Sequence, residues 1–183
     1  MKNFPLLKTI RVNPRMVNFL NRKFEQYKSV HPSWEDDNAF QDSGYQTPNL
    51  LEWEDEEYQN YIKNGPLKRL VNSHISCEWE YRWNHVLDYD KGHGQMAVHN
   101  HAATEDFVVF IYLKTCKTGE TVFYLNGWAP GRTRFGILPK VGLGAVFSSS
   151  TNHEGVYTGE NKRLFVCGVK LIQPADVLYM PLI

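Results

Sequence analysis

The sequence predicts an α+β fold in which helices come first and an antiparallel β core follows. In the first 76 residues, apolar side chains recur at three- and four-residue spacing, which is the helical period. From Cys77 onwards they alternate with polar side chains, which is the period of a strand. Turn residues separate the later strands with no helix between them, and this pattern favours an antiparallel sandwich or barrel.

The N-terminal part of the chain, residues 1–76, is expected to be mainly helical. A helix over 14–30 follows an asparagine cap and has Pro14 at its first position. A second helix is expected from Pro48, and the Asn-Gly-Pro sequence at 64–66 ends it. A short third helix comes directly after that break.

The β core is expected to span residues 77–172, followed by a tail over 173–183, with the whole chain forming one domain. Its first strand runs from Cys77 to Tyr89, with alternate residues on one buried face. Further strands are predicted near 95–101, 106–116, 120–126, 134–138, 143–149 and 162–172, and an additional strand over 5–12.

The charge balance gives no reason to expect a nucleic-acid or anionic-membrane partner. Lysine and arginine total 20, aspartate and glutamate total 20, and the formal net charge is zero. No stretch of about 18 apolar residues predicts a membrane span, and the N-terminus does not resemble a secretory leader. Three cysteines without CxxC spacing are typical of reduced core thiols, so a cytoplasmic protein is expected.

A histidine cluster is the main candidate for chemistry. His99 and His101 are two residues apart on a predicted strand, so both side chains point to one face. His153 follows a later strand and can return to the same end of a barrel, with Glu105 or Asp106 as nearby carboxylates. A metal that is held by histidine and carboxylate side chains, with coordination positions left open, is typical of a non-haem Fe(II) site. The alternative for the His-Asn-His segment alone is a polar turn between two strands.

Arg163 is a candidate anion-binding residue at the start of the last predicted strand. A guanidinium on an inward position is costly unless it meets an anion, and it can hold a carboxylate in a bidentate fork. The alternative is an exposed arginine at a strand end.

Over residues 89–171 the chain resembles the catalytic core of 2-oxoglutarate- and Fe(II)-dependent dioxygenases, in particular the prolyl-4-hydroxylase-like branch with its phage and bacterial relatives. Several features carry the resemblance in order and spacing: Tyr89 and a glycine turn before His99, the strand Phe110–Leu113, the Gly-Glu-Thr-Val-Phe segment at 119–123, the approach from Pro139 to His153, and Arg163 ten residues later. The resemblance implies a double-stranded β-helix core (a jelly roll, as in cupins) with the N-terminal helices packed on its sheet.

The same resemblance implies roles for individual residues. His99 would be the first iron ligand and His153 the distal one. Arg163 would bind the distal carboxylate of 2-oxoglutarate, with the Tyr112 hydroxyl helping and Tyr89 as a further contact. The implied cofactors are Fe(II), the co-substrate 2-oxoglutarate and O2. The implied activity is oxidation of a small-molecule or peptide substrate, most simply hydroxylation of a peptidyl or amino-acid substrate; oligomeric state stays open.

The chain departs from the family pattern at one ligand. The family has an aspartate two residues after its first histidine, and here that position is His101. Three arrangements are open: His101 is the third ligand, Asp106 replaces it because it shares strand parity with Tyr112, or the position has no protein ligand, as in halogenating relatives. We expect His101 to complete the site, with Asp106 as the alternative.

Two other functions remain open from the sequence. A cupin-type metal enzyme would use His99, His101, Glu105 and His153, although the second cupin motif is not met. A non-catalytic β-sandwich that serves as a binding module would explain the strands but not the spacing of the histidines and Arg163.

Overall fold

The computed structural model describes residues 7–32, 44–89, 96–125 and 134–172. The helical elements are α1 (Pro14–Val30), the 3-10 turn η1 (Leu50–Glu52), α2 (Glu56–Lys63) and α3 (Pro66–Asn72). The strands are β1 (Leu7–Arg11), β2 (Gly44–Gln46), β3 (Trp79–Tyr89), β4 (Met96–His99), β5 (Phe107–Tyr112), β6 (Thr121–Tyr124), β7 (Arg134–Ile137), β8 (Leu143–Ser148), β9 (Asn152–Gly155) and β10 (Lys162–Leu171).

The helices form largely where capping residues allow them to begin. The side chain of Asn13 accepts a hydrogen bond from the backbone N–H of Met16 at 2.9 Å, and α1 matches the predicted range. The second helix begins later than predicted. Asn49 caps only the short turn η1, and Asp55 then caps α2 through the N–H of Tyr58 at 2.7 Å, so two caps begin two separate segments.

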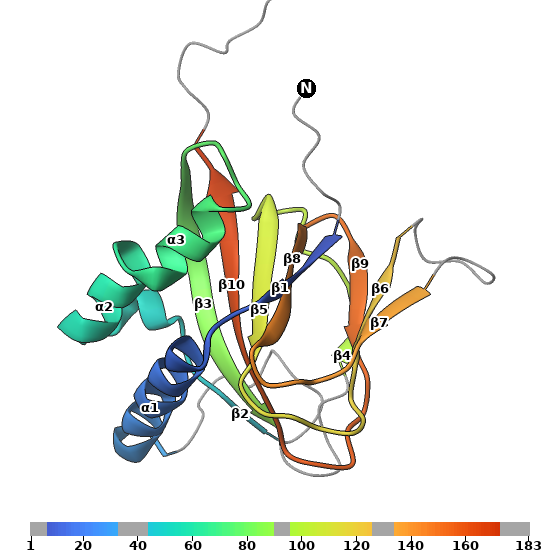
Figure 1. Ribbon diagram of the computed structural model, residues 1–183, viewed down its shortest axis with the longest axis horizontal. Helices are drawn as coiled ribbons and strands as arrows, with labels where there is room; N and C mark the ends of the chain where they lie inside the picture. The colour runs from blue at the N-terminus through green and yellow to red at the C-terminus, as the bar shows by residue number, and fades with distance from the viewer. Residues whose placement is uncertain (1–6, 33–43, 90–95, 126–133, 173–183) are drawn as a thin grey trace, which may run out of the picture.

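Two antiparallel sheets form the core of the protein. The larger sheet has the order β1-β8-β5-β10-β3-β2, and the smaller one has the order β4-β9-β6-β7. The helices lie on one side of the larger sheet, and the smaller sheet lies on its other side (Figure 1). The central strands of the larger sheet are therefore buried on both faces.

Each face of the larger sheet has its own apolar layer. The helix-side layer joins the helices to the sheet and includes Leu20, Phe24, Ile111 and Phe165. The inter-sheet layer lies between the two sheets. Its aromatic centre is formed by Phe110, Phe123 and Phe147, whose ring centroids are 4.9–6.4 Å apart.

Strand β3 changes faces along its length, which the predicted alternation does not include. The pairing of β10 with β3 shifts register between Gly168, which faces Trp83, and Val169, which faces Tyr81. The extra residue reverses which side chains point to which layer. Tyr81 and Trp79 consequently lie against the helix-side layer, whereas Trp83, Leu87 and Tyr89 lie in or against the inter-sheet layer.

The other predicted strands are present with shorter bounds, and two strands are additional. One of these, β9, carries His153 and pairs with both β4 and β6. Its sequence, Asn-His-Glu-Gly, has no apolar alternation, so periodicity alone does not reveal it.

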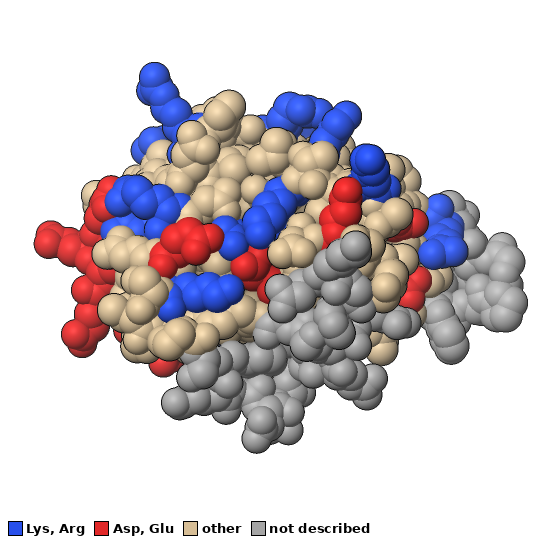
Figure 2. Space-filling view, turned by 90° about the horizontal axis from the view of Figure 1, so that it is seen from below, with Lys and Arg blue, Asp and Glu red and all other residues tan. Residues whose placement is uncertain are grey.

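The surface carries charges of both signs. On the face in Figure 2, lysine and arginine side chains lie among acidic and uncharged ones. All three cysteines are free thiols, as predicted, and Cys116 and Cys167 are buried. Among the described residues, none of the helices has the length and apolar character that crossing a membrane requires.

Candidate metal centre

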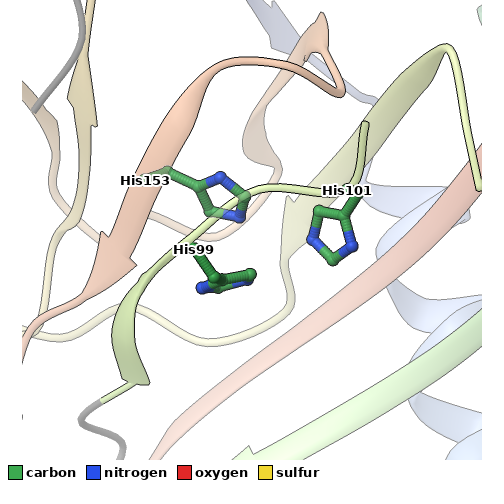
Figure 3. Close-up of side chains that lie close together, drawn as sticks. All are labelled: His99, His101 and His153. Carbon is green, nitrogen blue, oxygen red and sulfur yellow. The ribbon is translucent and has the colours of Figure 1, made fainter. Parts of the chain in front are cut away.

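Three histidine side chains converge on one point. Two of them lie on strands, and the third follows one of these strands. His99 ends β4, His153 lies directly opposite it on β9, and His101 follows β4 by two residues. One nitrogen from each ring lies within 4.8 Å of the others. The ring centroids are 4.2 Å apart for His99 and His153, and 5.0 and 5.3 Å from each of these to His101 (Figure 3).

Backbone carbonyl groups orient two of the rings. Nδ1 of His99 lies 2.8 Å from the carbonyl oxygen of Ala97, and Nδ1 of His153 lies 3.0 Å from that of Thr151. A carbonyl oxygen can only accept, so each Nδ1 must carry the proton and each Nε2 keeps a free lone pair. Holding the second nitrogen in this way is typical of histidines that bind metals.

Burial keeps His101 and His153 neutral. Burial, followed by the neighbouring His99, lowers the pKa of His153 to about 3. Burial, with a smaller contribution from His99 and an opposing one from Glu105, lowers the pKa of His101 to about 4. Both rings are therefore neutral at neutral pH, so each keeps one nitrogen with a free lone pair, which metal binding requires.

The donor set fits a divalent transition metal. Imidazole nitrogens suit iron, zinc, copper and nickel, whereas magnesium and calcium prefer oxygen. Three protein donors leave coordination positions for exogenous ligands, which is the arrangement of a catalytic rather than a structural site. The interpretation of His99-Asn100-His101 as no more than a polar turn therefore does not account for the geometry.

Asp106 does not join this cluster, so its prediction as an alternative ligand is wrong. Its carboxylate accepts the backbone N–H of Leu171 at 2.8 Å and lies 3.4 Å from Nζ of Lys170. The chain bends at Asp106, one residue before β5 begins at Phe107, so the parity of the strand does not extend to it. Glu105 points inward instead and lies beside His101, outside the group of three histidines.

Arg163 lies on the opposite face of the sheet from the position expected for it. Its Nε and Nη2 donate to the two carboxylate oxygens of Asp88 at 2.9 and 2.7 Å. Its Nη1 contacts Asn21 and Glu25 of α1 at 3.0 and 2.7 Å. Burial alone would raise the pKa of Asp88, but Arg163 lowers it below its ordinary value. The prediction that the Arg163 side chain points into the β core is wrong. Arg163 shares strand parity with Phe165, which faces the helices.

The residue before it, Lys162, has the opposite parity and is a buried cation that the sequence analysis does not single out. Lys162 is buried, and its Nζ donates to the carbonyl oxygens of Gly119 and Val156 at 3.2 and 3.3 Å. The same Nζ lies 5.1 Å from the ring centroid of Tyr89. Burial lowers the pKa of Lys162 to about 8. Because Val156 directly follows β9, the ammonium lies near the end of the strand that carries His153.

The two tyrosines expected to contact a co-substrate both lie in the inter-sheet layer. The hydroxyl of Tyr112 donates to the carbonyl oxygen of Ile137 at 2.9 Å, and it accepts the N–H of Thr121 at 3.0 Å. Its oxygen is also 2.6 Å from the hydroxyl of Thr121. These bonds give the Tyr112 hydroxyl a structural role within the chain, beside any role toward a ligand.

No family model matches the chain, and no curated protein matches it. Solved structures are similar to it. A prolyl-4-hydroxylase from Pseudomonas putida has a TM-score of 0.66 at 14% identity, over 92% of this chain and 94% of its own. The viral collagen prolyl hydroxylase from Paramecium bursaria Chlorella virus-1, in complex with 2-oxoglutarate, has a TM-score of 0.62 at 16% identity, over 91% and 97%.

A third similar structure is HygX from Streptomyces hygroscopicus, which holds nickel and 2-oxoglutarate. Its TM-score is 0.67 at 10% identity, over 92% of this chain and 83% of its own. At such identities the similarity establishes the fold. The fold resemblance predicted from residues 89–171 is confirmed, and at 92% coverage it includes most of the N-terminal part, for which the sequence names no relative.

Proposed function

We propose that the protein is an Fe(II)- and 2-oxoglutarate-dependent oxygenase in which His99, His101 and His153 hold the metal. The observation that carries the proposal is the convergence of the three histidines, two of them fixed by backbone carbonyls with Nε2 free. Bound iron would supply the oxygen-activating chemistry, coupled to decarboxylation of 2-oxoglutarate. The two sheets then correspond to the double-stranded β-helix core expected from the resemblance. The sheets and the N-terminal helices together form one domain.

Lys162 takes the role that the sequence gives to Arg163. A dicarboxylate needs a cation for its distal end, and Lys162 is a buried cation on the inner face of β10. Arg163 already holds Asp88. Tyr89 and Tyr112 line the same interior layer, so they remain candidates for contact with the co-substrate.

The substrate is proposed to be a peptidyl or free amino-acid side chain, and the reaction its hydroxylation. The support is the fold shared with two prolyl hydroxylases, one of which is named a collagen prolyl hydroxylase. We also propose a cytoplasmic location, since all three cysteines are free thiols.

Metal and co-substrate binding provide the direct test. Under anaerobic conditions the purified protein should bind Fe(II), and the loaded protein should bind 2-oxoglutarate, both followed by calorimetry. Aerobic incubation of the two with the protein should release succinate and CO2 slowly even without the true substrate. His153→Ala should abolish metal binding, and His74→Ala, a histidine remote from the cluster in sequence, should not. The proposal is refuted if the wild-type protein does not bind Fe(II), or if the metal-loaded protein does not bind 2-oxoglutarate.

A further inference from the structure

A buried carboxylate beside the metal centre lacks a cation within the described part of the chain. Glu105 is 3% exposed, and its Oε1 accepts the indole N–H of Trp83 at 2.6 Å. Its Oε2 has no hydrogen-bond partner among the described residues, and none of their lysines or arginines forms an ion pair with it. A buried carboxylate without a cation is costly, so a positive charge placed beside Glu105 would be stabilised.

The fold makes room for this carboxylate. A Cβ added at Gly168 would lie 2.6 Å from Cγ of Glu105 and 2.6 Å from Cε2 of Trp83. Gly168 sits at the register shift between β10 and β3, where Trp83 turns to the inner face. The hydroxyl of Ser149 donates to the carbonyl oxygen of Glu105 at 2.6 Å and fixes its backbone. Three separate segments therefore hold Glu105 in place.

Glu105 faces the one ligand that departs from the family pattern. Its Oε2 lies 3.9 Å from Nδ1 of His101. This distance is too long for a hydrogen bond. An approach of about 1 Å would bring the two atoms to hydrogen-bond distance.

We propose that Glu105 is a positioning residue for the metal centre: it accepts the Nδ1–H of His101 and supplies the negative charge that three neutral imidazoles lack. The inference rests on the proposed metal site. A carboxylate that accepts the second N–H of a ligating histidine fixes its tautomer and strengthens its basicity. With Fe(II), three neutral imidazoles leave two positive charges at the centre, and Glu105 reduces them to one, as a direct aspartate ligand would. The metal is in turn the missing cation for Glu105.

The test compares two readouts in Glu105→Gln, which keeps the shape of the side chain and removes its charge. Anaerobic calorimetry with Fe(II) alone should show an affinity 10- to 100-fold lower, in the range of lost outer-shell partners. The melting temperature of the metal-free protein should stay the same or rise, because a buried carboxylate is replaced by a neutral amide. Glu80→Gln, on exposed β3 surface, should change neither readout.

A double-mutant cycle separates charge compensation from packing. His101→Asp places a carboxylate directly at the centre, so Glu105→Gln in that background should weaken Fe(II) binding at most about threefold. An equal loss in both backgrounds, or a metal-free protein destabilised by Glu105→Gln, overturns the inference while leaving the proposed function intact. Unchanged Fe(II) affinity in the single variant does the same. A wild-type protein that binds no Fe(II) removes the proposed function itself.

Discussion

Lys162 and Arg163 are neighbouring cations on one strand, and the fold uses them in opposite ways. Arg163 faces the helices, where Asp88 and Glu25 supply its anions. Lys162 faces the smaller sheet, where backbone carbonyl oxygens are among its partners. Both side chains are buried. The difference teaches that burial of a charge does not by itself mark a binding site, because Arg163 is buried and the chain itself supplies its anions.

The largest expected effect separates the two cations by stability. Among the described residues, Arg163→Met leaves the largely inaccessible Asp88 with Lys114 at 3.2 Å and Lys28 at 3.6 Å as its cations, so the free energy of unfolding should fall by about 3 kcal/mol. Chemical denaturation measures this loss. Arg82→Met, in an exposed pair with Glu80, is the matched control and should cost less than about 1 kcal/mol.

The affinity of the folded Arg163→Met variant for 2-oxoglutarate should stay within about twofold of the wild-type value, since the two sites are independent. Lost 2-oxoglutarate binding with unchanged stability would instead return the co-substrate role to Arg163.

The sequence could not assign these faces because β10 is apolar on both sides. Leu164 and Val166 face one layer, and Phe165 and Cys167 face the other, so alternation does not show which side contains the site. The strand that carries His153 lacks apolar periodicity altogether, yet the spacing of His99, His101 and His153 predicted the cluster. The histidines of the site could be predicted from their spacing in the chain. The sheet face to which a side chain points depends also on the β-bulge in the β3–β10 pair and the bend at Asp106, which the sequence does not show.

The next effect is expected in co-substrate affinity. Lys162→Met should weaken binding of 2-oxoglutarate to the metal-loaded protein about 100-fold, because a buried charge partner of its carboxylate is lost. Binding of the metal alone should not change. Lys170→Met, on the same strand and paired with the partly exposed Asp106, is the matched control and should bind 2-oxoglutarate normally. Equal affinities for the wild type and Lys162→Met would exclude Lys162 as the carboxylate partner.

The smallest expected effect is a pH dependence that only the inward cation produces. The pKa of Lys162 lies at about 8, below its ordinary value of 10.5, because the side chain is buried. Lys162 is charged below that pH and loses its charge above it, so 2-oxoglutarate affinity should fall by up to about tenfold per pH unit above pH 8. Lys162→Arg keeps its charge throughout. The ratio of the two affinities, measured by calorimetry at each pH, cancels effects of the metal; a ratio that stays constant from pH 7 to 9.5 would show that the lysine charge does not bind the co-substrate.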